Sequence, residues 1–173
     1  MASVSQKRKK SQKRVKQKTN PFKEAIMATP DVTGCWKSGL AALGDDSKKV
    51  IIPKDVRVDG SLDIDGSTVH LYPSDSRWDY AVCCAGKVYY IEVHSAITSE
   101  VWTVIKKLRW LKSWLASNAP EIVKLTDYSI SPFYWVQSSN CQIPHHMPQY
   151  KMAVDNKLRP MKEWNYSEII MCK

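Results

Sequence analysis

Long apolar runs, glycine and paired cysteines are all scarce in this sequence, and each scarcity excludes a class of protein. No apolar stretch approaches the roughly 20 residues that span a bilayer, and the basic N-terminal stretch lacks the apolar core of a signal peptide. Only 6 of the 173 residues are glycine, and none of them forms a phosphate-cradling loop or a nucleophile elbow. We therefore expect a cytoplasmic protein with no membrane partner.

The five cysteines do not have the spacing of a zinc finger. They stand at positions 35, 83, 84, 141 and 172, and no two of them form a C-x₂-C pair. Reduced thiols that serve as small apolar residues are the simplest interpretation. Adjacent Cys83 and Cys84 should point to opposite faces if they lie in a strand.

The net charge of +9 belongs almost entirely to the first residues of the chain. Residues 1–19 hold eight of the 26 basic side chains and none of the 17 acidic ones, which leaves 18 basic and 17 acidic side chains in 20–173. We therefore divide the chain into a basic disordered tail, 1–20, and a single α/β domain, 21–173. The tail either holds a nucleic acid through phosphate contacts or is a solvated arm. Its candidate contacts are Lys7, Arg8, Lys9, Lys10, Lys13 and Arg14.

The first part of the domain combines helical and strand patterns. Residues 21–44 are predicted to be helical in two pieces that Pro30 separates, and the second piece should end near Gly44. Residues 56–72 alternate in the manner of strands, with glycine turns predicted at positions 60 and 66.

The centre of the chain has a clearer pattern. Two runs rich in β-branched and aromatic residues, 78–84 and 87–94, flank Ala85–Gly86 and predict a hairpin. Apolar residues at helical spacing predict a helix over 99–119, and 131–139 is typical of a buried strand. A strand, a crossover helix and a further strand indicate a mixed sheet flanked by helices.

The hairpin determines which side chains meet. A two-residue loop at 85–86 places Asp79 opposite Glu92 on one face, with His94 two residues further along the same face. Two adjacent carboxylates repel each other unless a proton or a cation lies between them, and such oxygen ligands suit Mg²⁺ or Mn²⁺. The alternative is an edge hairpin with solvated charges, but its aromatic and β-branched neighbours favour a buried position.

These residues resemble a known superfamily. An Asp at the start of one strand, a hairpin, Glu-x-Lys on the next strand, then a helix and a further strand is the pattern of PD-(D/E)XK nucleases. The matching residues are Trp78-Asp79-Tyr80 and Ile91-Glu92-Val93-His94. The resemblance covers about residues 30–140 and implies a restriction-endonuclease-like fold, in which a central mixed sheet is flanked by helices. A wider stretch, from GSLDID through RWDYAV to YYIEVHSA, also resembles a group of bacterial proteins without an assigned activity.

The sequence departs from the superfamily pattern in two places. His94 occupies the position of the family's lysine, so that a cation is replaced by a group that is mostly neutral at pH 7. The first helix of the family often supplies a further acid, whereas Glu24 is the only carboxylate in 21–30. Asp63 and Asp65, on the preceding predicted strand, are candidates for that missing ligand.

The resemblance implies a metal-dependent phosphodiesterase that acts on DNA or RNA. Asp79, Glu92 and Asp63 would hold Mg²⁺ or Mn²⁺ with help from the Val93 carbonyl, and His94 would orient or deprotonate the attacking water. Asp79, Glu92 and His94 would then be the catalytic residues. The alternative is a nuclease-fold module without turnover that binds nucleic acid or a protein partner.

The helix predicted over 99–119 carries two further sets of candidate contacts. Lys106 and Lys107 are expected either to contact phosphate or to belong to a solvated basic face. Trp102, Trp110 and Trp114 could stack on bases, but tryptophans on a half-buried helix more often fill a core or a protein interface. A protein partner or a homo-oligomer therefore also stays open.

Overall fold

The structure is a computed structural model that describes residues 19–171. Short helices and strands alternate along the chain, and one helix is much longer than the others. In chain order the elements are α1 (Pro21–Met27), η1 (Pro30–Val32), η2 (Ala41–Lys49), β1 (Val50–Ile51), β2 (Val58–Asp63), α2 (Ile64–Thr68), β3 (Tyr80–Cys84), β4 (Lys87–His94), η3 (Thr98–Glu100), α3 (Val101–Asn118), α4 (Pro120–Val123), β5 (Phe133–Gln137), α5 (Pro148–Asp155), β6 (Trp164–Asn165) and α6 (Tyr166–Met171).

A four-stranded mixed sheet lies at the centre, in the order β2-β3-β4-β5. β2, β3 and β4 are successive antiparallel neighbours, and β5 runs parallel to β4. The parallel pair requires a crossover connection, which α3 and α4 supply. β1 and β6 form a separate two-stranded parallel sheet. The predicted mixed α/β architecture is therefore confirmed at the level of a mixed sheet flanked by helices.

The predicted hairpin forms with the expected register. β3 and β4 pair Tyr80 with Ile91 and Cys84 with Lys87. The two loop residues, Ala85 and Gly86, have φ angles of 48° and 77°. Positive φ at both central positions is the geometry of a type I′ turn, whose twist matches that of the strands it joins.

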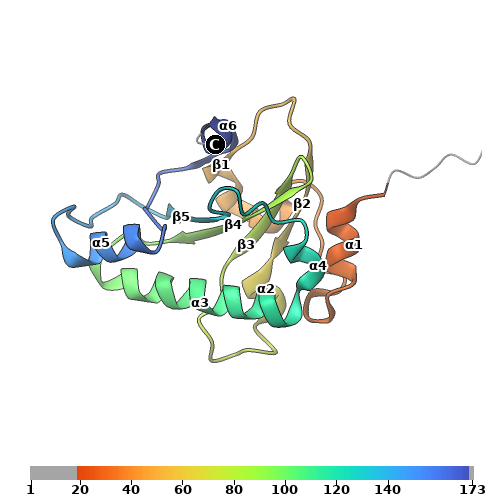
Figure 1. The fold of residues 1–173 in the computed structure, drawn as a ribbon, viewed down its shortest axis with the longest axis horizontal. Coiled ribbons are helices and arrows are strands. Elements are labelled where there is room, and N and C mark those ends of the chain that lie inside the picture. Colours follow the sequence, from red (N-terminus) through yellow and green to blue (C-terminus); the bar gives the residue numbers. More distant parts are fainter. Residues whose placement is uncertain (1–18, 172–173) are drawn as a thin grey trace, which may run out of the picture.

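The two faces of the main sheet are covered differently (Figure 1). α1, α3 and α4 pack on one face, over a core that includes Cys83, Tyr90 and Trp135. η2, β1, β6 and α6 cover the other face, over a core that includes Cys84 and Trp164. The two adjacent cysteines thus enter opposite cores, as the alternation of a strand predicts. The cysteines at 35, 83, 84 and 141 are all free thiols.

The second helical piece predicted within 21–44 is wrong. After the single 3₁₀ turn Pro30–Val32, Gly34 adopts a φ of 83°, which ends any regular right-handed helix. The following segment extends far enough for Lys37 to form an isolated bridge with Ser61 of β2. Residues 41–49 then form 3₁₀ turns instead of an α-helix.

The glycine turns predicted at 60 and 66 are also wrong. β2 continues through Gly60 as a bulge with a φ of 140°, and a side chain there would approach Trp36 Nε1 to 2.2 Å. Gly66 lies inside α2, which begins because the Asp63 carboxylate accepts a hydrogen bond of 2.8 Å from the Gly66 N–H. Asp63 and Asp65 therefore do not alternate along one strand, and Asp65 instead pairs with Arg77.

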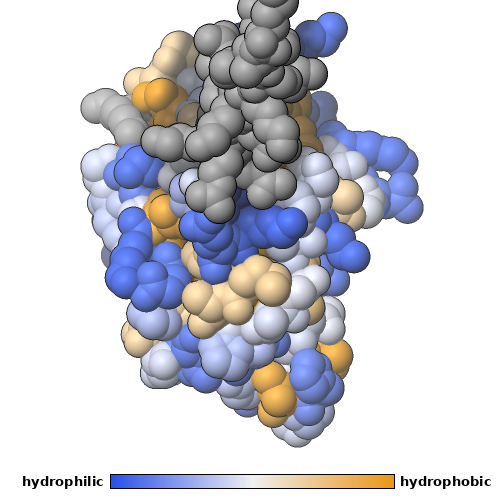
Figure 2. Space-filling view, turned by 90° about the vertical axis from the view of Figure 1, so that its right-hand side faces the viewer, coloured by the Kyte–Doolittle hydropathy of each residue, from blue (hydrophilic) through white to orange (hydrophobic). Residues whose placement is uncertain are grey.

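The exposed surface shows little clustering of apolar residues on the side of α1. In Figure 2, hydrophobic residues on the visible part of that face are separated by hydrophilic ones. Scattered single apolar residues are ordinary on a protein surface. Among residues 19–171, no helix has the length and apolar character that crossing a membrane requires.

Candidate functional site

Asp79 and Glu92 meet on the α3 side of the sheet. The Glu92 carboxylate accepts a hydrogen bond of 3.1 Å from the Asp79 N–H, and the Asp79 carboxylate accepts one of 2.9 Å from the Val93 N–H. Each acid therefore uses one oxygen to hold the other strand's backbone. This reciprocal pair confirms the register that the hairpin predicted, and it leaves Asp79 Oδ1 and Glu92 Oε1 available to a third group.

Lys107 of α3 is that third group. Its ammonium donates to Asp79 Oδ1 at 2.7 Å and also to Glu92 Oε1. The Glu92 side chain is fully buried, and the Lys107 and Asp79 side chains are only 14% and 19% exposed. Fully ionised, the three groups carry a net charge of −1 in a nearly dry environment. A positive charge between the carboxylates is therefore required for this arrangement to be stable.

The packing of α3 explains why Lys107 reaches the carboxylates. Val104 and Leu111 are both buried, and they lie three residues before and four residues after Lys107. Positions at these spacings lie on the same side of a helix. Lys107 thus projects from the edge of the buried stripe toward the sheet, whereas its neighbour Lys106 is exposed.

The protonation equilibria of the site reflect burial and the close carboxylates. Burial and the neighbouring Asp79 charge raise the pKa of Glu92 well above its ordinary value, although Lys107 acts in the opposite direction. Burial lowers the pKa of Lys107, but the Glu92 and Asp79 carboxylates outweigh it and raise that pKa overall. Both raised pKa values mean that the site binds protons more readily than the isolated side chains would.

His94 extends the site toward the surface. Its Nδ1 lies 3.5 Å from Glu92 Oε1, and its Nε2 lies 2.9 Å from Glu100 Oε2 of η3. The interaction with His94 lowers the pKa of Glu100. The Trp135 indole donates to the His94 carbonyl at 3.2 Å and so holds the end of β4. His94 therefore lies on the same face as Glu92, as the alternation of the strand predicted.

Asp63 lies near this site without joining the Lys107 contacts. It pairs with Tyr80 across β2 and β3, which places it next to Asp79 at the sheet edge. Burial raises the pKa of Asp63, and the charges of Asp65 and Asp79 add to that effect. Its carboxylate is engaged as the cap of α2 through Gly66. Its assignment as a metal ligand stays a prediction.

The site offers two carboxylate oxygens to a metal ion but no third ligand of these residue types among the described residues. Within residues 19–171, no group of three or more His, Cys, Asp or Glu side chains is arranged to hold a metal ion. Asp79 Oδ1 and Glu92 Oε1 do converge on one point, which Lys107 Nζ occupies. Mg²⁺ often takes only one or two carboxylates and completes its shell with water. The two oxygens therefore suit such an ion, provided that the ammonium moves away.

The two candidate basic contacts on α3 differ in position, because Lys107 lies at this site whereas Lys106 is exposed. The tail residues Lys7, Arg8, Lys9, Lys10, Lys13 and Arg14 lie outside the described residues. Among the three tryptophans of α3, Trp114 is buried, and Trp110 stacks on it with a centroid distance of 5.9 Å. Trp102 is 46% exposed beneath Arg109. For Trp114, the core interpretation is confirmed.

Sequence reasoning missed two features of the site. Lys107 was expected either at a phosphate or on a solvated basic face, and its place between the carboxylates could have been anticipated only from its spacing to Val104 and Leu111. Glu100 precedes α3 without any motif, and it reaches His94 only because η3 turns the chain back over the end of β4.

Comparison with known proteins adds no relative on which these residues could be placed. No family model matches the chain, and neither a curated protein nor a solved structure is significantly similar to it.

Proposed function

We propose that this protein is a metal-dependent phosphodiesterase of the restriction-endonuclease-like fold, with DNA or RNA as its substrate. The observation that carries the proposal is the convergence of Asp79, Glu92 and Lys107 from two adjacent strands and the following helix. Two acids and one lysine are the residue types of the PD-(D/E)XK motif that the sequence resembles. Lys107 would supply from α3 the ammonium that His94 does not supply from β4.

The topology supports the same proposal. α1, β2, β3, β4, α3 and β5 follow one another in the order helix, three strands, helix, strand. The sheet order follows the chain order, and β3 is the strand that runs antiparallel to the others. Asp79 immediately precedes β3 and Glu92 lies near the end of β4, which are the positions that the resemblance implies.

Each residue would have a distinct role. Asp79 Oδ1, Glu92 Oε1 and the Val93 carbonyl would hold Mg²⁺ or Mn²⁺, which stabilises charge on a phosphate and lowers the pKa of bound water. Lys107, displaced from between the carboxylates, would remain close enough to neutralise a phosphate oxygen. His94, whose Nε2 is held by Glu100, would turn Nδ1 toward the site and accept a proton from the attacking water.

A nuclease-fold module without turnover is the second candidate. The observation that favours it is that the Lys107 ammonium already contacts both carboxylates and occupies the point on which they converge. Such a protein would bind nucleic acid or a protein partner through other residues, and its binding would survive loss of the acids.

Cleavage assays separate the two candidates. Labelled single- and double-stranded DNA and RNA are incubated with the full chain and Mg²⁺, Mn²⁺ or EDTA. The phosphodiesterase should cleave at least one substrate only with a metal, and Glu92→Gln and Asp79→Asn should each reduce the rate at least 100-fold. Lys54→Met, which changes an exposed lysine in a turn outside the site, should retain the rate. Metal-independent cleavage, or equal rates in the acid variants, would contradict the proposal.

A further inference from the structure

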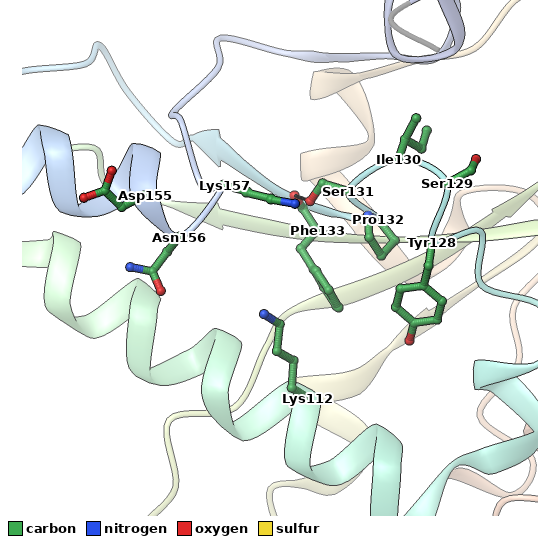
Figure 3. Close-up of a pocket in the computed structure, with 10 residues that line it drawn as sticks. All are labelled: Lys112, Tyr128, Ser129, Ile130, Ser131, Pro132, Phe133, Asp155, Asn156 and Lys157. Atoms are coloured by element: carbon green, nitrogen blue, oxygen red, sulfur yellow. Dashed lines mark hydrogen bonds between the residues drawn. The ribbon is translucent and has the colours of Figure 1, made fainter.

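A polar cavity of about 370 Å³ lies between α3, the C-terminal end of α5 and the loop that leads into β5 (Figure 3). Its walls come from Lys112 of α3, residues 128–133 and residues 155–157. Sites for small ligands usually measure about 300 to 1,000 Å³. The cavity therefore has room for a small molecule.

Two ammonium groups converge in this cavity. In Figure 3, Lys112 reaches up from α3 and Lys157 reaches in from the end of α5, while the Asp155 carboxylate points away from both. The Lys112 ammonium lies 5.2 Å from the centre of the Phe133 ring. Among residues 19–171, neither lysine forms an ion pair with a carboxylate. The cavity thus favours an anionic group.

The backbone at Lys157 is an independent sign of function. Lys157 has a φ of 58°, in the left-handed region. Its N–H donates to Val154 O at 2.8 Å, and the Leu158 N–H donates to Ala153 O at 2.9 Å, which together form a Schellman cap. Glycine is strongly preferred at this cap position. A lysine there accepts backbone strain and aims its side chain into the cavity, and strained residues cluster at ligand sites.

The cavity continues into an apolar part that suits a ring. A neighbouring cavity of about 230 Å³ shares Lys112, Tyr128 and Phe133 with the first and is otherwise lined mainly by apolar side chains such as Leu115 and Val123. Tyr128 is 57% exposed, although it is a large aromatic side chain at the junction of the two cavities. An exposed tyrosine ring at such a junction can stack on a planar base.

From these observations we propose that this cavity binds a nucleoside monophosphate. The Lys112 and Lys157 ammonium groups and the Ser131 hydroxyl would hold the phosphate, and the base would lie against Tyr128. Glu92 and Lys107 line neither of the two cavities, so the proposal does not rest on the phosphodiesterase assignment.

Calorimetric titration of the full chain with AMP tests this site. Wild type should bind AMP saturably, and adenosine at least about tenfold more weakly. Lys157→Gly should weaken AMP binding at least about fivefold, because a charged hydrogen bond is lost. The same change relieves the backbone strain, so its melting temperature should stay the same or rise. Tyr128→Ala should weaken both AMP and adenosine about fivefold or more.

Lys54→Met is the charge-matched control, because Lys54 is exposed in a turn outside the cavity. This variant should bind AMP like the wild type. In the wild type, AMP should also shift the amide resonances of residues 128–131 and 156–157, which locates the site. A 5′-phosphorylated oligonucleotide is titrated in parallel with AMP. Tighter binding of AMP means that the ligand is a free nucleotide, and tighter binding of the oligonucleotide means that it is the phosphorylated end of a strand. The proposal is overturned if AMP does not bind saturably, or if Lys157→Gly and Tyr128→Ala bind it like the control.

Discussion

Two carboxylate clusters lie against α3, and they are stabilised in different ways. Asp31 accepts hydrogen bonds from the Tyr72 hydroxyl at 2.7 Å, the Trp114 indole at 2.9 Å and the Asn118 amide at 3.3 Å. All three donors are neutral. At the other cluster, Asp79 and Glu92 receive backbone hydrogen bonds from each other's strand and share the charged Lys107.

The two clusters need different partners because they hold different numbers of carboxylates. Neutral hydrogen-bond donors are sufficient for a single carboxylate. The Asp31 cluster thereby connects three segments, which are η1, α3 and the loop that follows α2. Two adjacent carboxylates need a cation, because neutral donors do not cancel their mutual repulsion. The cation at the second cluster is the Lys107 ammonium, which contacts both carboxylates. The Asp31 cluster therefore joins three parts of the fold, whereas the Asp79–Glu92 pair is a site that requires a cation.

The largest expected effect comes from removing Lys107. Lys107→Met leaves the buried Glu92 and the largely buried Asp79 without a cation and should lower the free energy of unfolding by about 3–5 kcal/mol at pH 8. The raised pKa of Glu92 means that the folded protein binds a proton more readily than the unfolded chain above Glu92's ordinary pKa of 4.5. Stability should therefore recover as the pH falls toward that value. Urea unfolding at pH 8 and pH 5.5 measures both effects.

Added divalent metal provides a second test of the same site. If the two carboxylates can hold Mg²⁺ or Mn²⁺, either ion should raise the melting temperature of Lys107→Met more than that of the wild type, where the ammonium competes. Lys106→Met, with its exposed side chain, should stay within about 0.5 kcal/mol of the wild type. A loss that is the same at both pH values and insensitive to metal would show that the pair does not require a cation.

Removal of Asp31 should lower the stability less than removal of Lys107, and added divalent metal should not change the loss. Asp31→Ala removes the acceptor of three hydrogen bonds and should cost about 2 kcal/mol. The hydrogen bond to Asp31 raises the pKa of Tyr72 to about 12. In the variant that pKa should fall toward 10, which ultraviolet titration of tyrosinate measures. An unchanged Tyr72 titration would mean that the hydrogen bond from Tyr72 to Asp31 does not form in solution.

The smallest effect is expected at the rim of the cation site. Glu100→Gln removes the charged partner of His94 and should cost less than about 1 kcal/mol, because the pair is partly solvated. The lowered pKa of Glu100 gives the wild type a stabilisation that is present above pH 4.5 and is lost as the pH falls through the lowered value. Wild type and variant should therefore converge in acid. A difference that persists at pH 3 would assign the effect to packing.

Particular elements show why some features were predictable. The register of the hairpin follows from the loop at Ala85–Gly86, because each further pair is fixed once the turn is fixed. That local rule is sufficient to place Asp79, Glu92 and His94 on one face. The turns predicted at Gly60 and Gly66 failed for the opposite reason. Trp36 lies where a side chain at 60 would go, and Asp63 caps a helix through the Gly66 N–H. The first contact joins segments that are far apart in the chain, and the second forms only because β2 ends at Asp63. The alternating pattern by itself indicates neither of them.

The charge of the tail, the hairpin and the face that its two acids share can be predicted from the sequence alone, because they depend on composition and on neighbours along the chain. The cation that meets those acids and the convergence of Lys112 and Lys157 depend on how distant segments pack. The rotation of α3 about its axis depends on how its apolar stripe packs on the sheet. The approach of α5 to the start of β5 depends on a loop whose path no local pattern encodes. Both are long-range packing outcomes, and side chains far apart in the chain come together only through them.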